Sequence, residues 1–243
     1  ADLIYHLAAT VGVKLILEQL VETLESNVQG CENVIRLAHS NGNKKVILAS
    51  SSEVYGKSPV VPWNEGDDIH LGPTSYGRWG YACSKMMDEF LGLAYNKEKG
   101  LPVVVIRFFN TVGPRQKGQY GMVLPRFVSQ ALAGEPITVY GDGTQSRCFT
   151  HVDDVVGAII DISHVPEAEG QVFNVGNNSE IDINHLAELV KDTLGSSSPI
   201  SHVPYDQAYG VDFEDIARRI PGLDKIQSYI DFQPGSDLRP VIK

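Results

Sequence analysis

The architecture of this chain follows from the segment Val46-Ile47-Leu48-Ala49-Ser50-Ser51-Ser52-Glu53, in which an apolar run leads directly into hydroxyl groups and a carboxylate. A continuous apolar run of this length is typical of a parallel strand that is buried on both faces. Residues 103–106 (Val-Val-Val-Ile) and 3–7 (Leu-Ile-Tyr-His-Leu) have a similar character. We therefore predict that these segments are strands of one sheet.

Helical spacing of apolar residues fills the intervals between these strands. It predicts one helix over residues 15–38, ended by Asn41-Gly42, and a second over residues 76–99, ended by Gly100. Parallel strands that are joined by helices form a right-handed α/β sheet with helices on both faces. The predicted fold class is therefore α/β with a parallel sheet.

The second half of the chain contains shorter elements. The apolar pattern predicts helices over residues 123–133, 152–163 and 183–194 and strands over residues 137–140 and 171–175.

The chain is expected to divide into two parts. We expect residues 1–112 to form the sheet domain and residues 113–243 to form mainly a smaller α/β part that covers a substrate. Within that second part, residues 151–176 are expected to return to the sheet domain.

The composition excludes several classes of function. Lys and Arg number 20 against 30 Asp and Glu, and the resulting net charge of −10 argues against an extended surface for nucleic acid. The sequence contains no run of about 18 apolar residues, so no transmembrane helix is expected. Cys31, Cys83 and Cys148 lie far apart and indicate neither a disulfide framework nor a metal site. We therefore expect a cytoplasmic protein without nucleic-acid, membrane or metal partners.

Tyr81 and Lys85 stand four residues apart on the second predicted helix. Both side chains then share one helix face, so the ammonium can stabilise the phenolate and lower the Tyr81 pKa. Such a tyrosine can act as a general base or acid towards an alcohol. Ser51 and Glu53 should face the same cleft, because ligands bind beyond the carboxyl ends of parallel strands. The Tyr–Lys pair alone is weak evidence, since an exposed helix face can carry it by chance.

Several segments together resemble those of a known family. In chain order they are His6-Leu-Ala-Ala9, residues 50–56 (Ser-Ser-Ser-Glu-Val-Tyr-Gly), Tyr81-x-x-x-Lys85, Arg107-Phe-Phe-Asn110 with Gly113-Pro-Arg115, Tyr140-Gly-Asp-Gly143 and Arg147-Cys-Phe-Thr-His-Val-Asp-Asp154. With these segments, which span nearly the whole chain, the sequence resembles the extended short-chain dehydrogenases/reductases that modify nucleotide sugars. The resemblance implies a Rossmann-like sheet, NAD as cofactor and a UDP-sugar as substrate.

The resemblance also implies roles for individual residues. Ser51 would hydrogen-bond the sugar 4-hydroxyl, Tyr81 would take its proton, and Lys85 would hold the nicotinamide ribose. The catalytic residues implied are Ser51, Glu53, Tyr81 and Lys85; those implied to bind NAD are Leu7, Ala8, Ala9, Asn27 and Ser50, with Tyr81 and Lys85; those implied to bind the substrate are Asn110, Arg115, Arg147 and Arg219. Arg147 and Arg219 would clamp the diphosphate, a task that suits the paired N–H groups of a guanidinium.

Three charged residues that lie close in sequence to these implied site residues have a structural interpretation: Asp153, Asp154 and Arg218. We expect Asp153 and Asp154 to cap the helix that contains Val155. For Arg218 a surface salt bridge explains the residue as well as a substrate contact does.

Members of the resembled family first oxidise C4 of the sugar, and the fate of the 4-keto sugar distinguishes them. Ser52 departs from the Asp-Glu pair of the 4,6-dehydratases, which disfavours loss of water. The Ser52-Glu53 pair is similar to that of UDP-glucuronate decarboxylases, although some epimerase-like sequences keep the glutamate. The sequence slightly favours a UDP-sugar 4-epimerase, with UDP-glucuronate decarboxylase as the alternative.

The resembled family opens with a GxxGxxG turn, and this motif is absent from the sequence. We therefore expect a Rossmann-like domain that is incomplete at its N-terminus and begins near the family's fourth strand. A truncated, non-redox relative that binds a nucleotide sugar is thus an alternative of another class. The two long predicted helices resemble the family's dimer interface, so a homodimer is expected.

Overall fold

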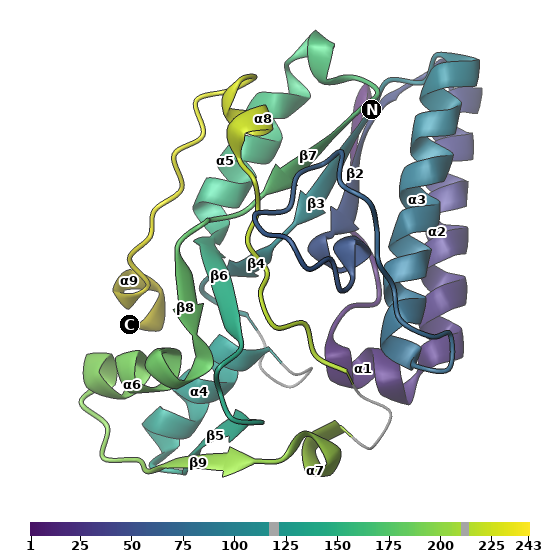
Figure 1. Ribbon diagram of the computed structural model, residues 1–243. Coiled ribbons are helices and arrows are strands. Elements are labelled where there is room, and N and C mark those ends of the chain that lie inside the picture. Colours follow the sequence, from purple (N-terminus) through teal and green to yellow (C-terminus); the bar gives the residue numbers. More distant parts are fainter. Residues whose placement is uncertain (117–121, 210–213) are drawn as a thin grey trace.

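Parallel strands form the main sheet of the computed structural model, which describes residues 1–116, 122–209 and 214–243 (Figure 1). They are β1 (Leu3–His6), β2 (Lys45–Ser51), β3 (Val103–Phe108) and β7 (Gln171–Val175), in the spatial order β1-β2-β3-β7. Each neighbouring pair is parallel, so the predicted α/β fold with a parallel sheet is confirmed.

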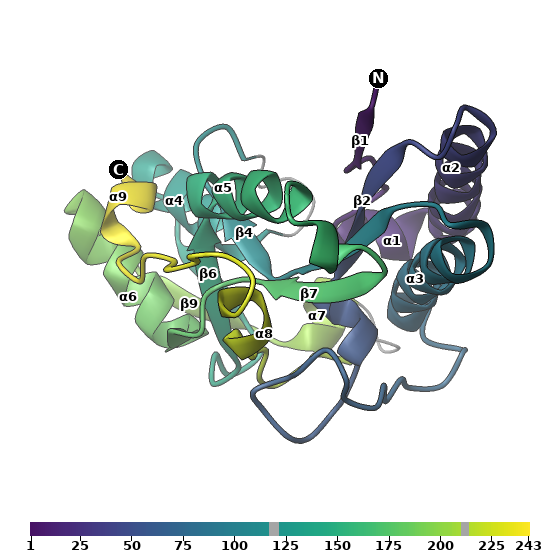
Figure 2. The same ribbon diagram turned by 90° about the horizontal axis from the view of Figure 1, so that it is seen from above.

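Helices cover both faces of this sheet (Figure 2). On one side lie α2 (Leu20–Ser40) and α3 (Gly77–Lys99), and on the other lie α5 (Val152–Ser163) and the short α8 (Asp224–Gln227). Successive strand side chains point to opposite faces. Val46 and Leu48 accordingly pack with residues of α2, and Ile47 packs with residues of α5. Burial on both faces explains the continuous apolar run in β2.

The helix predicted over residues 15–38 is in fact two helices, α1 (Val13–Glu18) and α2. Gln19 separates them, with φ −135° and ψ 52°, outside the helical region. The break allows Ile16 of α1 to line the cavity described below while α2 packs along α3. Apolar spacing continues across Gln19, so the sequence pattern did not reveal the break.

A second lobe of short elements lies beyond the carboxyl ends of the main strands (Figure 1). Its strands are β4 (Asn110–Val112), β6 (Ser146–His151) and β8 (Glu180–Asp182) in one sheet and β5 (Ile137–Tyr140) and β9 (Ile200–Val203) in another. Its helices are α4 (Val123–Ala133), α6 (Ile183–Leu194), α7 (Tyr205–Tyr209) and α9 (Arg239–Ile242). The predicted bounds of α4, β5, α5, β7 and α6 are confirmed.

The start of α5 differs from the predicted cap. His151, not an aspartate, is the N-cap residue, because its Nδ1 accepts a hydrogen bond from the backbone N–H of Asp153 at 3.1 Å. Asp153 and Asp154 lie in the first turn, where the helix dipole stabilises carboxylates. Asp154 also accepts a hydrogen bond from the backbone N–H of Gly235 at 3.0 Å. Both aspartates are therefore structural, but neither caps the helix.

Membrane-spanning helices and metal-binding clusters are absent from the part of the chain that the structure describes. No helix there is both long enough and apolar enough to span a membrane. The same described residues contain no group of three or more His, Cys, Asp or Glu side chains that could hold a metal ion. Cys31 and Cys148 are buried free thiols, and Cys83 is an exposed one.

Candidate active site

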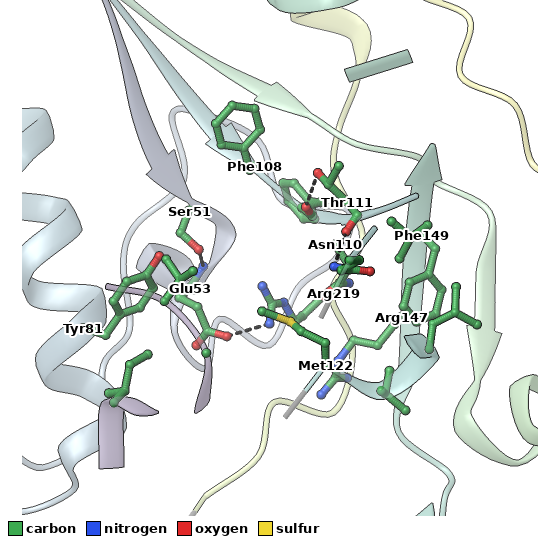
Figure 3. A pocket seen from close by; sticks show the side chains of 18 of the residues that line it. Ser51, Glu53, Tyr81, Phe108, Asn110, Thr111, Met122, Arg147, Phe149 and Arg219 are labelled. Carbon is green, nitrogen blue, oxygen red and sulfur yellow. Dashed lines mark hydrogen bonds and ion pairs between the residues drawn. The ribbon is translucent and has the colours of Figure 1, made fainter. Parts of the chain in front are cut away.

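A cavity of about 420 Å³ lies beyond the carboxyl ends of β2 and β3, between the main sheet and the second lobe (Figure 3). Its walls include Ser51 at the end of β2, Glu53 just after it, Tyr81 from α3 and Arg147 from β6. Segments far apart in the sequence thus bring polar side chains to one space. Such a position is where parallel α/β sheets bind their ligands.

Glu53 is carried by a 3-10 helix, η1 (Ser52–Tyr55). Ser51 caps this helix, because its Oγ accepts a hydrogen bond from the backbone N–H of Glu53 at 3.2 Å. The helix ends at Gly56, whose φ of 61° and close approach to a neighbouring backbone carbonyl leave no room for a side chain. Tyr55, the last residue of η1, stacks on Trp63 with 5.0 Å between ring centroids. Both ends of η1 are therefore held in place.

The buried carboxylate of Glu53 is clamped by two arginines. Arg78 from α3 donates from Nε to Oε2 at 3.1 Å and from Nη2 to Oε1 at 3.0 Å. Arg219 donates from Nη1 to Oε1 at 2.6 Å and from Nη2 to the Ser52 hydroxyl. Burial alone would raise the pKa of Glu53, but the charges of Arg78 and Arg219 outweigh burial and lower the pKa to about 2. Glu53 is therefore ionised at neutral pH.

Asp215 extends this network towards the second lobe. Its Oδ1 accepts from Nη1 of Arg78 at 2.9 Å, and both its oxygens accept from Nη2 of Arg147, at 2.9 and 3.0 Å. The Tyr205 hydroxyl donates to Oδ2 at 2.9 Å. Burial would raise the pKa of Asp215, but the charges of Arg147 and Arg78 lower it to about 2. Arg78 is thus a cation shared by two carboxylates.

This network carries one positive charge in excess. Three guanidinium groups face two carboxylates; the residues are Arg78, Arg147, Arg219, Glu53 and Asp215. Burial lowers the pKa of Arg219, and the charges of Arg147 and Arg78 add to this effect against the opposing charge of Glu53. Guanidinium groups bind phosphates and carboxylates through paired N–H donors. The cavity is therefore suited to an anionic ligand.

Tyr81 and Lys85 both line the cavity, but the predicted lowering of the Tyr81 pKa is wrong for this structure. Burial and the charge of Glu53 raise the pKa of Tyr81 to about 12, and a hydrogen bond with Ser51 only partly opposes them. Lys85 does not compensate, because its Nζ donates to Asp88 Oδ2 at 3.0 Å and to the Ala49 carbonyl at 3.2 Å. The charge of Asp88 also raises the Tyr81 pKa.

Most of the residues singled out from the sequence line this cavity. They are Leu7, Ala9, Ser50, Ser51, Glu53, Tyr81, Lys85, Asn110, Arg147 and Arg219. Ala8, Asn27 and Arg115 do not belong to the described lining residues. The Oδ1 of Asn27 accepts a hydrogen bond from the backbone N–H of Thr10 at 2.8 Å and so holds the loop after β1. Arg115 is exposed in a turn after β4, at a φ of 69°.

Two lining residues use their polar groups within the protein. The Ser50 hydroxyl donates to Glu89, which forms a two-point ion pair with Arg107 at 2.9 and 2.7 Å. Asn110 donates from Nδ2 to the Cys148 carbonyl at 3.1 Å.

The two arginines predicted to clamp a diphosphate have different partners. Arg219 lies against Glu53, whereas Arg147 is paired with Asp215. The neighbouring Arg218 forms a two-point surface pair with Glu180 at 2.8 and 2.7 Å, which agrees with the structural interpretation of that residue.

Sequence reasoning missed Arg78, Asp215 and Tyr205. Arg78 stands three residues before Tyr81, so the helical spacing that joined Tyr81 to Lys85 also placed Arg78 on that face. Asp215 and Tyr205 reach the cavity from irregular or short segments of the second lobe. No periodic signal in the sequence marks them.

A sequence profile of the NAD dependent epimerase/dehydratase family matches residues 1–176. The chain belongs to this family of enzymes. The resemblance to short-chain dehydrogenases/reductases that act on nucleotide sugars is thereby confirmed.

Several proteins similar to this chain are named for reactions of UDP-sugars. UDP-N-acetyl-alpha-D-glucosaminuronate decarboxylase of Bacillus cytotoxicus is 43% identical over 96% of this chain and 72% of its own length. UDP-glucuronic acid decarboxylase 1 of Danio rerio is 35% identical over 96% of this chain, which spans only 53% of that protein. Among solved structures, a UDP-N-acetylglucosamine 4-epimerase from Methanobrevibacter ruminantium, in complex with UDP-N-acetylmuramic acid, superposes with a TM-score of 0.85. It is 30% identical and covers 99% of this chain and 74% of its own.

Proposed function

We propose that this chain carries the catalytic site of an NAD-dependent decarboxylase that acts on a UDP-uronic acid, a UDP-sugar with a carboxylate on C5. The decisive feature is the ionised, doubly clamped Glu53 beside Ser51 and Tyr81 in one cavity. Two relatives named as decarboxylases of UDP-uronic acids support the reaction, since each is similar to 96% of this chain.

The wall beside Tyr81 fits the nicotinamide part of NAD. Leu7, Ala9 and Ala49 add apolar lining to the cavity, and the Ala49 carbonyl accepts a hydrogen bond from Lys85. The Lys85 ammonium has three donor positions, and its contacts with Ala49 and Asp88 leave it able to bind a ribose hydroxyl as well. When bound, NAD supplies the acceptor for a hydride from C4 of the sugar and later returns it.

Tyr81 and Ser51 would move the proton of the sugar 4-hydroxyl. Tyr81 would accept this proton in its phenolate form while the C4 hydrogen leaves as hydride, so that a ketone forms at C4. The hydrogen bond from Ser51 favours the phenolate form of Tyr81, which counteracts part of the effect of burial.

A ketone at C4 turns the C5 carboxylate into a β-keto acid. The bond between C5 and the carboxyl carbon breaks, carbon dioxide leaves, the electron pair passes into the enolate of the ketone, and C5 then takes a proton. A buried, ionised Glu53 disfavours a second carboxylate close to it and so favours the conversion of that group into neutral carbon dioxide. Arg78 and Arg219 keep Glu53 ionised and oriented.

4-Epimerisation is the second candidate, supported by the structural similarity to the UDP-N-acetylglucosamine 4-epimerase. The sequence alone slightly favoured this reaction. The decarboxylase relatives reverse the order, because the more similar of them is 43% identical to this chain.

A panel of nucleotide sugars tests the proposal. The protein is incubated with NAD and, separately, UDP-glucuronate, UDP-N-acetylglucosaminuronate, UDP-glucose and UDP-N-acetylglucosamine, and products are identified by mass spectrometry and NMR. We expect carbon dioxide and a correspondingly lighter UDP-sugar from a uronate. A product of unchanged mass with inverted C4 would instead support the epimerase, and binding without any turnover would support a non-redox relative.

A further inference from the structure

Asp215 forms an ion pair with Arg147, the guanidinium that would bind a nucleotide diphosphate in this cavity. Arg147 lies on the wall of the cavity opposite Tyr81 (Figure 3). Its Nη2 donates to both oxygens of Asp215, at 2.9 and 3.0 Å, and its Nη1 donates to the Ser146 carbonyl at 2.7 Å. The donors that face Asp215 are the kind that bind phosphate oxygens, since a guanidinium recognises carboxylate and phosphate alike.

Asp215 also has partners that do not depend on Arg147. Arg78 donates to Oδ1 at 2.9 Å, and the Tyr205 hydroxyl donates to Oδ2 at 2.9 Å. The backbone N–H of Ile216 donates to Oδ1 at 2.8 Å. A carboxylate that lost Arg147 would therefore still be hydrogen-bonded and paired with a cation, so its release from Arg147 would not leave an uncompensated buried charge.

The charge of Asp215 opposes a phosphate in the same place. With Asp215 ionised the network has one positive charge in excess, and without it the excess would double. Like charges in a buried site repel strongly, because the effective dielectric constant there is lower than in water. Asp215 thus weakens the attraction of the cavity for an anionic ligand while it holds Arg147 in the cavity wall.

We propose that Asp215 is an internal competitor for Arg147, and that the diphosphate of a bound nucleotide displaces it from this guanidinium and leaves it on Arg78 and Tyr205. The proposal rests on the proposed function only in that the ligand is a nucleoside diphosphate. Asp215 is accordingly a positioning residue that sets the affinity for the phosphate part of the ligand and not for its base.

Calorimetric titration of the purified protein with uridine, UMP and UDP tests this role. We expect Asp215→Asn to tighten UDP binding roughly tenfold, to tighten UMP binding less, and to leave uridine binding unchanged. Glu214→Gln is the matched control, because Glu214 is the adjacent acid, pairs with Lys57 at 3.0 Å and does not belong to the described lining residues. This control should change UDP binding less than about twofold. In an Arg147→Ala background the effect of Asp215→Asn should disappear.

Three results would overturn the inference. Weaker UDP binding by Asp215→Asn would show that the carboxylate prepares Arg147 for phosphate, and an equal change for uridine would show a purely structural role. Failure of both the unaltered protein and Asp215→Asn to bind UDP would also exclude competition. If Asp215→Asn does not fold, Asp215→Ser also removes the charge and takes its place, with the same expected and contradicting results. A protein that binds UDP as expected but releases no carbon dioxide from any uronate would contradict the proposed function alone.

Discussion

Glu53 combines burial with a full negative charge, and two guanidinium groups make this combination possible. Taking a carboxylate out of water is costly, and the cost is offset only by close cations and good hydrogen bonds. Arg78 supplies a two-point pair, and Arg219 adds a third hydrogen bond. The negative charge is therefore a fixed property of the site and not one that changes near neutral pH.

Glu53→Gln should separate the two stages of the proposed reaction. Glutamine keeps the shape but removes the charge, so we expect release of carbon dioxide to fall on the order of 100-fold, while a 4-keto sugar still forms. Single-turnover assays that follow NADH absorbance and carbon dioxide separately measure both stages.

The control for this variant is Glu180→Gln, which neutralises a carboxylate paired with Arg218 outside the described cavity lining. It should leave both stages unchanged. Equal losses of C4 oxidation and carbon dioxide release in Glu53→Gln would instead show that Glu53 supports the whole site.

The buried carboxylates of Glu53 and Asp215 should make the folded protein less stable in acid. The pKa values of Glu53 and Asp215 are about 2 in the folded protein, below the value of about 4 that carboxyl groups have in unfolded chains. Their contribution is present above pH of about 4.5 and is lost as the pH falls towards 2, because the unfolded chain binds protons first. Asp88 opposes this trend, since burial raises its pKa.

Thermal unfolding followed by circular dichroism from pH 7 to pH 2.5 measures this dependence. We expect a decreasing melting temperature below pH of about 4.5 and a shallower decrease in Asp215→Asn. A melting temperature that stays constant between pH 5 and pH 3 would contradict the assignment of both low pKa values.

Helix α3 carries a buried ion pair directly behind its functional face. Asp88 is 1% exposed and Lys85 is 2% exposed, and their charged atoms lie 3.0 Å apart. Burial raises the pKa of the Cys31 thiol of α2, and the nearby charge of Asp88 adds to this effect. The pair thus fixes the position of Lys85 relative to β2 through the contact with the Ala49 carbonyl.

Asp88→Ala should destabilise the protein by about 3 kcal/mol, because it leaves the Lys85 ammonium buried without its carboxylate. Glu98→Ala removes an exposed acid from the same helix and should cost less than about 1 kcal/mol. Urea unfolding followed by fluorescence of the two tryptophans gives both free energies. Similar values for the two variants would contradict a stabilising role for the buried pair.

The elements differ in how far their sequences predict them. Apolar periodicity predicted α4, α5 and α6 at both ends, because each buries one face against a core. It did not predict β6, whose residues Ser-Arg-Cys-Phe-Thr are buried although most of them are polar. Two of the polar side chains have partners in distant segments: Ser146 donates to Glu180, and Arg147 donates to Asp215. Only the folded chain provides those partners.

In the candidate site, too, the sequence predicts local relations between residues but not contacts between distant segments. The Tyr81–Lys85 relation is local, and helical spacing placed both side chains at the cavity. The charge around Tyr81 does not follow from this pair, since Glu53 approaches it from η1 and Asp88 lies two turns further along α3, and both raise its pKa. The position of a side chain was therefore predictable where its ionisation was not.

Helix α3 also presents apolar side chains to solvent. Met87 and Phe90 are spaced three apart on its outer face and are 53% and 65% exposed. Helix faces of this kind often pack against a second copy of the chain. We therefore expect a homodimer that forms through the helices α2 and α3.

Phe90→Asp should convert this dimer into a monomer in size-exclusion chromatography with light scattering. Leu132→Asp is the matched control, because Leu132 is 70% exposed on α4 in the second lobe. The control should leave the mass unchanged. A monomeric unaltered protein would contradict the expected interface.

The return of β7 to the main sheet has a mechanical consequence. The chain passes from β3 into β4, comes back through α5 and β7, and leaves again into β8, so several covalent connections join the two lobes (Figure 1). Strain in one lobe is therefore passed to the other through more than one peptide segment. A protease that cuts one of these connections would leave the lobes attached, and they should melt together as one cooperative unit.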